Sequence, residues 1–377
     1  MSRVTRLEGC PTPIGSQVND GEALSALLPR DRRLDRTAQM AIAASGTALV
    51  DANLADGAPP SASERAGVVV GSSRGATERI EQWHAGFLKE GVEGVGAHAS
   101  PHTTAGNMSG AVARRFGLRG PALSVSAACA SATQAIGLAF DLIRHGRADL
   151  MLAGGTEAAL TPFSIAMFSK AGMLSPRLEP PEAVCRPFDR DRDGIVVGEG
   201  AGMVVLESEA HARARGARVY AEVLGFGSTC DALSLTAVPD DGAGLARAIT
   251  LSLADARLAP EAIDYVNAHG TGTRAGDRSE TMALKTALGA HARRTAVSST
   301  KSMTAHLIGA TGGIEAIACA LAIVEGAVPP TINLEHADPD CDLDFVPGEA
   351  RRLRVRNVLS ISMGFGGNNA CLVFGPA

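Results

Sequence analysis

Cys129 is the residue in this sequence best placed to act as a nucleophile. It lies in residues 124–133, where a run typical of a strand ends and a helical pattern opens. Unpaired N–H groups and the helix dipole at such a position stabilise a thiolate, so we expect a lowered pKa for the Cys129 thiol. Small neighbours such as Ala128 and Ala130 would let a thioester approach the sulfur. Position alone leaves a catalytic thiol and a packed core thiol equally open.

Two histidines are candidate partners of this thiol. His269 and His306 each follow a predicted strand, and ligands of α/β proteins bind at the carboxyl ends of strands. A single histidine there is more often a satisfied core residue, but two histidines and a helix-opening cysteine indicate a site. Lys301 and Glu315 add a cation and a carboxylate that either orient a histidine or form an ion pair.

Residues 362–369 form a glycine-rich turn near the end of the sequence. It contains Gly364, Phe365 and Gly366, and its backbone N–H groups are suited to stabilising an oxyanion. The alternative is a tight structural turn. Its spacing matches neither a dinucleotide-binding loop nor a P-loop, so we do not expect nucleotide binding.

The elements that must position these residues follow an α/β pattern. Short apolar runs predict strands, and apolar residues at helical spacing within 132–143 and 313–325 predict buried helices. The pattern restarts near Gly216, which suggests two similar halves, 1–216 and 217–377. The runs predicted as strands are residues 66–70, 122–126, 149–153, 203–207, 219–224, 262–267, 295–299, 358–362 and 370–374.

Composition excludes several classes of function. The net charge of -5 gives no support for nucleic-acid binding. Seven cysteines without paired spacing argue against disulfides and zinc, and the six other than Cys129 are expected to be mostly buried thiols. No uninterrupted apolar run reaches the roughly 18 to 20 residues that cross a bilayer, so we expect a cytoplasmic protein.

Residues 189–194 imitate a calcium loop without its register. The bidentate glutamate belongs at position twelve, which is Gly200 here, whereas the nearest glutamate is Glu199. We interpret the segment as a structural turn with an internal ion-pair network, and we expect no metal and no cofactor.

Taken together, these segments resemble the β-ketoacyl-acyl carrier protein synthases, specifically the elongating class with a Cys-His-His active site. The resemblance covers nearly the whole chain from about residue 32 and includes several further motifs. These are residues 119–121 (RGP), 153–157 (AGGTE), 186–189 (RPFD), 198–202 (GEGAG), 329–333 (PPTIN) and 341–347 (CDLDFVP). It implies a thiolase-like fold, with two related αβαβα halves in a five-layered arrangement. The nucleophile would belong to the first half, and both histidines and the glycine turn to the second.

The resemblance implies a decarboxylative Claisen condensation in fatty acid, polyketide or aryl-polyene synthesis. Cys129 would take the acyl group from an acyl carrier protein, and His269 and His306 would stabilise the enolate formed as malonyl carrier protein loses carbon dioxide. The N–H groups of Cys129 and Phe365 would bind the later oxyanion. Lys301 and Glu315 would hold the surroundings of the nucleophile and the histidines.

The resemblance also implies residues that contact substrate. Thr271 and Thr273 would contact the phosphopantetheine arm, and Phe365, flanked by Gly364 and Gly366, would gate access of the second substrate. Ala105 and Phe168 would border the acyl chain. Relatives that prefer straight saturated chains carry a bulky apolar residue near Ala105, so a small residue here suggests a deeper pocket. These seven residues are the expected substrate contacts.

The amino end departs from the family pattern, because about 30 residues of the usual excursion before the first helix are missing. Arg30, Arg32 and Arg33 remain there and are suited to an acidic carrier protein, although a solvated charged face is an equal alternative.

Two rival functions remain. A catalytically silent chain-length factor would pair with a ketosynthase, but such proteins usually lack the cysteine. A thiolase would need a second reactive cysteine, and Cys371 lies inside a predicted strand. We expect a homodimer or a heterodimer with a related subunit. The alternative function is that this chain is the subunit of a ketosynthase/chain-length-factor heterodimer that has a mainly structural role.

Overall fold

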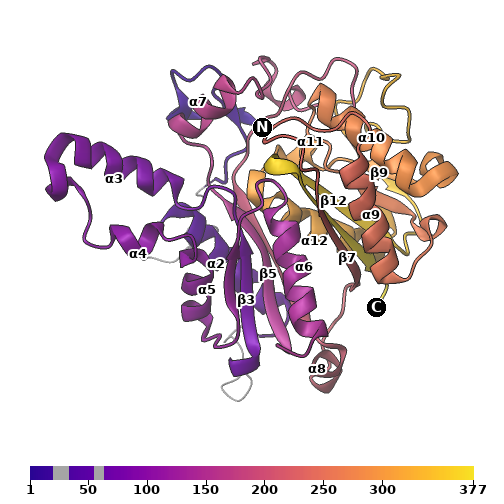
Figure 1. Ribbon diagram of the computed structural model, residues 1–377, viewed down its shortest axis with the longest axis horizontal. Coiled ribbons are helices and arrows are strands. Elements are labelled where there is room, and N and C mark those ends of the chain that lie inside the picture. Colours follow the sequence, from indigo (N-terminus) through magenta and orange to yellow (C-terminus); the bar gives the residue numbers. More distant parts are fainter. Residues whose placement is uncertain (20–33, 55–62) are drawn as a thin grey trace.

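The computed structural model describes residues 1–19, 34–54 and 63–377 (Figure 1). Arg30, Arg32 and Arg33, expected to meet a carrier protein, lie outside the described residues.

The first half of the chain forms a four-stranded sheet of order β4-β3-β5-β6. Strand β3 is parallel to both of its neighbours, and β6 runs antiparallel to β5. Strand β3 is buried throughout, whereas β4 is an edge strand whose first two residues are exposed. The strands are β3 (Ala66–Gly71), β4 (Ala122–Val125), β5 (Leu150–Glu157) and β6 (Gly200–Glu207).

The second half forms a five-stranded sheet of order β7-β13-β12-β8-β9. Strands β12, β8 and β9 are parallel, so the loops that follow them meet at one edge. Strands β12 and β13 form an antiparallel hairpin. The strands are β7 (Glu222–Cys230), β8 (Tyr265–Asn267), β9 (Ala296–Ser298), β12 (Val358–Gly364) and β13 (Asn368–Gly375).

Two helices lie between the sheets and complete a five-layered core (Figure 1). The central helices are α6 (Ser131–Arg144) and α12 (Thr311–Glu325). Helices α2 (Arg36–Asp51) and α5 (Asn107–Phe116) cover the outer face of the first sheet, and α9 (Ala243–Ala256) packs on the outer face of the second, against α10 (Arg274–Leu288). Three apolar clusters fill the spaces between these layers. The expected five-layered arrangement is therefore confirmed.

The remaining elements lie around this core. Helices α3 (Thr77–Glu90) and α4 (Ala99–Thr103) project from the body, and α3 has no buried residue (Figure 1). Three short helices are α7 (Pro162–Lys170), α8 (Glu209–Ala214) and α11 (Lys301–Thr304). Two small ribbons pair β1 (Ser2–Arg3) with β2 (Ile14–Gly15) and β10 (Ala327–Val328) with β11 (Arg351–Arg352).

Every run predicted as a strand overlaps an observed strand, and most differences are at the ends. The largest concerns β7, predicted at 219–224 but observed at Glu222–Cys230. Val219 is exposed, whereas residues up to Cys230 pair with β13. The pairing partner decides this boundary, and apolar content around residue 219 misled the prediction.

One segment of the described chain, Ile308–Glu325, is long and apolar enough to cross a membrane. It is not an uninterrupted apolar run, because it contains Thr311 and Glu315. The segment is α12 with the turn before it, and α12 packs against α6 and both sheets. Its apolar composition is therefore that of a helix buried on several sides.

Helix α6 approaches the second sheet closely at Gly137, where an added Cβ would lie 2.4 Å from the ring of Phe226. We expect Gly137→Ala to lower the unfolding free energy by about 1–3 kcal/mol through overpacking. Gly110→Ala on α5 is the matched control, because a Cβ there meets nothing within 4 Å, and it should raise stability by up to about 1 kcal/mol. Chemical denaturation of both variants measures the difference, and equal shifts would contradict this packing.

Candidate active site

The turn before α6 presents Cys129. The helix begins at Ser131, so Cys129 lies two residues before it rather than at its first position. Ala128 has a φ of 49°, a conformation that costs a non-glycine residue about 1–3 kcal/mol and is concentrated at functional sites. The Ser131 hydroxyl donates to the Ala128 carbonyl and accepts from the Ala127 N–H. These bonds fix the strained turn, and Cys129 as a whole residue is 9% exposed.

His306 lies directly against this sulfur. Its Nε2 is 3.0 Å from Cys129 Sγ, and its Nδ1 is 3.0 Å from Thr311 Oγ1. The preceding residue, Ala305, has a φ of 62°. The His306 backbone is held on both sides, donating to the Val196 carbonyl and accepting from the Gly198 N–H. Both ring nitrogens of His306 are thus fixed in position.

His269 completes the group from the end of β8. Its ring meets that of His306 edge to face, with centroids 5.5 Å apart and planes at 87°. The Glu280 carboxylate accepts the N–H groups of His269 and Gly270 at 2.6 and 2.7 Å. Nδ1 of His269 is buried and has no partner among the described residues. The structure therefore brings Cys129, His269 and His306 together.

Lys301 and Glu315 form a fully buried ion pair beside these three residues, with Nζ 2.5 Å from Oε1. The Lys301 charge lowers the pKa values of Cys129 and both histidines. The second Glu315 oxygen has no partner in the described part of the chain. This pair acts on the thiol through the Lys301 charge. Among the described residues, no hydrogen bond joins Lys301 or Glu315 to Cys129.

Burial leaves the thiol and both imidazoles neutral. Loss of solvation raises the pKa of Cys129 to about 12, and the Lys301 charge only partly opposes this. Burial lowers the pKa of each histidine well below its usual value, and Lys301 lowers it further. The expected fall in the Cys129 pKa is therefore wrong, because desolvation outweighs the favourable charges in the free chain.

The glycine turn lies against the Cys129 turn. A Cβ at Gly364 would stand 2.4 Å from the Ala127 carbonyl and 3.2 Å from the Cys129 nitrogen, so only glycine fits at this approach. Phe365 follows directly and is half-buried. Gly366, with a φ of 78°, donates its N–H to the Leu235 carbonyl. The N–H groups of Cys129 and Phe365 consequently belong to adjoining loops.

Of the four other expected substrate contacts, three lie near the site and one, Ala105, does not. Phe168 is buried in the same apolar cluster as Cys129. Thr271 is buried and Thr273 half-buried, with hydroxyl oxygens 3.2 Å apart beside the histidine loop. Ala105 is exposed, between α4 and α5. Within the described chain, Ala105 does not belong to the apolar cluster around Cys129.

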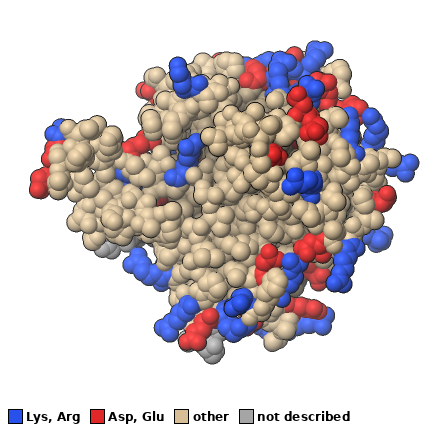
Figure 2. Space-filling view, in the orientation of Figure 1, with Lys and Arg blue, Asp and Glu red and all other residues tan. Residues whose placement is uncertain are grey.

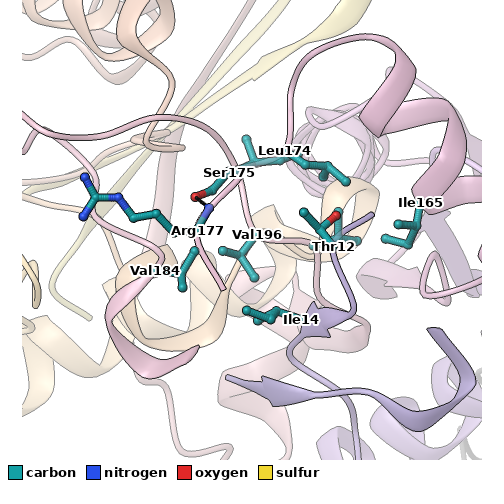
Figure 3. Close-up of a pocket in the computed structure, with 10 residues that line it drawn as sticks. Thr12, Ile14, Ile165, Leu174, Ser175, Arg177, Val184 and Val196 are labelled. Atoms are coloured by element: carbon teal, nitrogen blue, oxygen red, sulfur yellow. Dashed lines mark hydrogen bonds between the residues drawn. The ribbon is translucent and has the colours of Figure 1, made fainter. Parts of the chain in front are cut away.

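The apolar cluster around Cys129 adjoins a small cavity. Figure 3 shows this cavity, of about 10 Å³, whose lining includes Thr12, Ile14 and Ile165. That volume holds about one water molecule. Ile165 belongs both to this lining and to the Cys129 cluster. A long acyl chain bound here would have to displace side chains of the cluster.

Four residues have roles in the site that the sequence did not predict. Ala128 and Ala305 hold the strained turns beside Cys129 and His306, Glu280 anchors the His269 loop, and Thr311 contacts His306. Backbone strain has no sequence signal at an alanine. Glu280 and Thr311 lie on helices, where a carboxylate or hydroxyl is commonplace, so only the fold reveals their partners.

The other cysteines are all free thiols, as expected, but they are not uniformly buried. Cys185, Cys319, Cys341 and Cys371 are buried, whereas Cys230 is exposed and Cys10 is intermediate. Cys371 lies inside β13, and burial raises its pKa to about 12. It is thus unsuited to be the second reactive cysteine of a thiolase.

Asp189, Asp191 and His336 carry side-chain atoms within 4.8 Å of one another. The Asp189 carboxylate already accepts the N–H groups of Asp191, Glu335 and His336. Arg192 pairs with Asp277 and Asp338, both outside residues 189–194. The segment is a turn held by ion pairs, but the pairs of Arg192 join it to residues outside 189–194 rather than forming the expected internal network.

Comparison with known proteins identifies relatives over most of the chain. Residues 17–212 match the family described as the β-ketoacyl synthase N-terminal domain, and residues 220–335 match its C-terminal domain. The chain is 46% identical to the 3-oxoacyl-[acyl-carrier-protein] synthase 2 of Synechocystis sp. over 361 residues, which are 96% of this chain and 86% of that protein.

Solved structures share the fold. The ishigamide ketosynthase/chain length factor is 39% identical, with a TM-score of 0.89 over 100% of this chain and 91% of that chain. A type II polyketide acyl-carrier protein in complex with its ketosynthase, bound to the hexaketide, gives 34% identity and a TM-score of 0.89 over 98% of this chain and 89% of that chain.

The buried pair of Lys301 and Glu315 makes a prediction about stability. Lys301→Met leaves the Glu315 carboxylate buried and unpaired, so we expect it to lower the unfolding free energy by about 3–5 kcal/mol. The double variant Lys301→Met with Glu315→Gln removes both charges and should recover most of that loss. Denaturant unfolding of the two variants measures the effect, and a double variant no more stable than the single one would contradict the pairing.

Proposed function

The chain belongs to the β-ketoacyl synthase family, and we propose that Cys129 carries its acyl group during a decarboxylative Claisen condensation with malonyl-acyl carrier protein. The protein is an acyltransferase of thiolase-like fold. The observation that carries the proposed site is the 3.0 Å contact between Cys129 Sγ and His306 Nε2, with the His269 ring packed against His306.

In the first half-reaction, Cys129 takes the acyl group from the thioester of a carrier protein. The buried thiol is neutral in the free chain, so its proton must leave as the new bond forms. His306 Nε2 is within hydrogen-bond distance to receive it. The tetrahedral oxyanion would accept N–H groups of Cys129 and Phe365, whose loops adjoin at Gly364.

In the second half-reaction, the malonyl group loses carbon dioxide and its carbanion attacks the acyl-enzyme. Charge develops on the malonyl thioester oxygen, where neutral His269 and His306 would donate hydrogen bonds. Burial keeps both rings uncharged, and a dry site strengthens such bonds. The ion pair of Lys301 and Glu315 holds a charge beside them, which makes these two positioning residues.

Substrate contacts follow from the same geometry. The hydroxyls of Thr271 and Thr273 lie together beside the His269 loop and are suited to the phosphopantetheine arm. Phe365, in its glycine turn, would gate access of the second substrate. Phe168 borders the acyl side of Cys129. Ala105 would border the acyl chain only where a second subunit covers it, because it is exposed in the single chain.

We infer that the protein works as a dimer, with an identical or a related subunit. Apolar side chains are exposed on α3, on the turn after it and on edge strand β4, among them Phe87, Leu88, Val92 and Leu123. Charged side chains gather at the rim of the face in Figure 2 and are sparse at its centre. A relative assembled as ketosynthase and chain length factor supports a heterodimer as the second possibility.

The acyl carrier protein is the proposed substrate carrier, supported by the relative solved in complex with one.

The chain would divide near residue 216 into the halves 1–216 and 217–377, since each half forms one of the sheets. We infer a cytoplasmic location from the kinship with 3-oxoacyl-acyl-carrier-protein synthases and from the burial of α12 in the core.

Incubation with acyl carrier protein bearing acyl groups of several lengths should add one acyl mass to the protein. Peptide mapping should place that mass on Cys129, because its sulfur is the thiol held against His306. Intact-protein mass spectrometry provides the measurement, and Cys230→Ala, at an exposed thiol, is the control that should acylate normally. No adduct at any length would sink the proposal.

The two half-reactions should separate by substitution. Cys129→Gln should stop condensation yet retain malonyl decarboxylation, because the histidines remain. His306→Ala should reduce decarboxylation by about 10²–10³-fold, the usual effect of removing a donor at a developing oxyanion. Release of labelled carbon dioxide from malonyl carrier protein measures both. Equal decarboxylation in the two variants would contradict the assigned roles.

A further inference from the structure

Arg74 is a cation near the nucleophile that the reaction steps described above do not use. It lies in the loop that joins β3 to the projecting helix α3 (Figure 1). Its guanidinium carbon stands 5.2 Å from the centre of the Phe168 ring, and Phe168 belongs to the apolar cluster of Cys129. The Arg74 charge also lowers the pKa of the Cys129 thiol. Together these contacts put a guanidinium on the acyl side of Cys129.

The topology of the first sheet explains why Arg74 and Cys129 are neighbours. Strands β3 and β4 are parallel, so the loops that follow them leave the same edge of the sheet. The loop after β3 carries Arg74, and the turn after β4 carries Cys129. The two segments are joined where Ser72 donates its N–H to the Val125 carbonyl at 3.0 Å.

One buried carboxylate fixes the loop that carries Arg74. Glu157, at the end of β5, accepts the N–H groups of Ser73 and Arg74 at 2.8 and 3.1 Å, and the Ser72 hydroxyl at 3.1 Å. It also accepts the Gly309 N–H from the turn before α12. Glu157 is thus occupied by backbone and hydroxyl donors, and the loop has a defined position beside the site.

The Arg74 side chain lacks a counter-charge in the part of the chain that the structure describes. No ion pair joins its guanidinium to a described carboxylate, and its buried Nε has no hydrogen-bond partner there. Arginine is always charged, and a partly desolvated charge is costly without a partner. The fork of N–H groups on a guanidinium matches the two oxygens of a carboxylate. A carboxylate is therefore the ligand that suits this side chain.

Building on the function proposed above, we propose that Arg74 selects acyl groups whose far end carries a carboxylate, which its guanidinium binds while Cys129 holds the acyl carbon. The substrate class is the half-thioester of a dicarboxylic acid. The Cys129 sulfur bonds to the acyl carbon as the bond to the phosphopantetheine sulfur breaks, and the thiol proton ends on that leaving sulfur. The far carboxylate takes no part in these bond changes, so Arg74 is a specificity-determining residue.

The same guanidinium disfavours an apolar chain. A methyl end in place of the carboxylate would remove water from the Arg74 charge without replacing its hydrogen bonds, and such a penalty rejects the wrong ligand as effectively as a new contact selects the right one. The cavity that adjoins the Cys129 cluster is about 10 Å³. We therefore expect a short dicarboxylic acyl group.

The test compares acyl carrier proteins that bear matched acyl groups. Succinyl, glutaryl and adipoyl groups are each paired with an apolar isostere, in which methyl groups replace both carboxylate oxygens, and with a methyl ketone, in which a methyl group replaces one. Intact-protein mass spectrometry of the full-length protein gives the rate at which each group is transferred to Cys129. We expect the best dicarboxylic group to react about 10- to 100-fold faster than its apolar isostere, the usual effect of hydrogen bonds to a charged group.

Substitution of Arg74 should remove this preference. Arg74→Met loses the charge, so the ratio of the dicarboxylic rate to the apolar rate should fall by about 10- to 100-fold. Arg74→Lys keeps the charge without the fork and should retain part of the ratio. Arg218→Met is the matched control, because Arg218 is exposed and also lies over an aromatic ring, that of Tyr220, and it should keep the parent ratio. Each ratio is taken within one variant, so a loss of folded protein cancels.

Two kinds of result would overturn the proposal. One is a parent protein that prefers the apolar isosteres, or a ratio that stays unchanged in Arg74→Met. The other is an equal loss of the methyl ketone and dicarboxylic rates in Arg74→Met, which would assign a neutral oxygen to Arg74 in place of a carboxylate.

A binding measurement separates this proposal from the proposed function. Amide analogues of the acyl-phosphopantetheines have no thioester to react, and calorimetry gives their affinities for the full-length protein. Tighter binding of a dicarboxylic analogue, lost in Arg74→Met, would support Arg74 even where no group acylates Cys129, a result in which the proposed function alone fails. Acylation of Cys129 with no preference for a carboxylate in either measurement would keep the function and overturn the role of Arg74.

Discussion

The site depends on one packing constraint, the meeting of the amino ends of the two central helices. A Cβ at Gly312 in α12 would stand 2.1 Å from the Thr133 hydroxyl oxygen in α6, and Thr133 in turn bonds the Ser362 hydroxyl of the second sheet at 2.7 Å. Helices that approach this closely bring together the turns in front of them. Cys129 and His306, 177 residues apart in sequence, meet there.

The environment that this packing creates is deeply buried. Burial keeps the Cys129 thiol protonated and both imidazoles neutral. The charges that act on the thiol are those of Lys301, which is paired with Glu315, and of Glu157 and Arg74. Such a site would be poor for chemistry that needs a strong base. It suits a reaction in which decarboxylation itself creates the carbon nucleophile and the protein stabilises the charge that develops. Strained turns at Ala128 and Ala305 are the backbone cost of this arrangement.

The strands and the buried helices could be predicted from sequence patterns, whereas the five-layered arrangement and the roles of the three central site residues were implied by the resemblance to the β-ketoacyl-acyl carrier protein synthases. Apolar periodicity marked the strands and the buried helices, and Cys129, His269 and His306 each followed a strand. The electrostatics were not predictable in this way, because the Cys129 pKa is set by burial that only the assembled layers produce. Thr311 carried no signal for a similar reason, since its contact with His306 depends on how α12 meets the turn before it.

The central claim is that one buried thiol stores an acyl chain while carbon dioxide loss drives the condensation. The most direct measurement is the stoichiometry of a single turnover, in which acylated protein is mixed with labelled malonyl carrier protein and both products are quantified. The account predicts one carbon dioxide and one β-ketoacyl thioester for each acyl group lost from Cys129. Loss of the acyl group without matching carbon dioxide, or carbon dioxide release without a β-ketoacyl product, would contradict it.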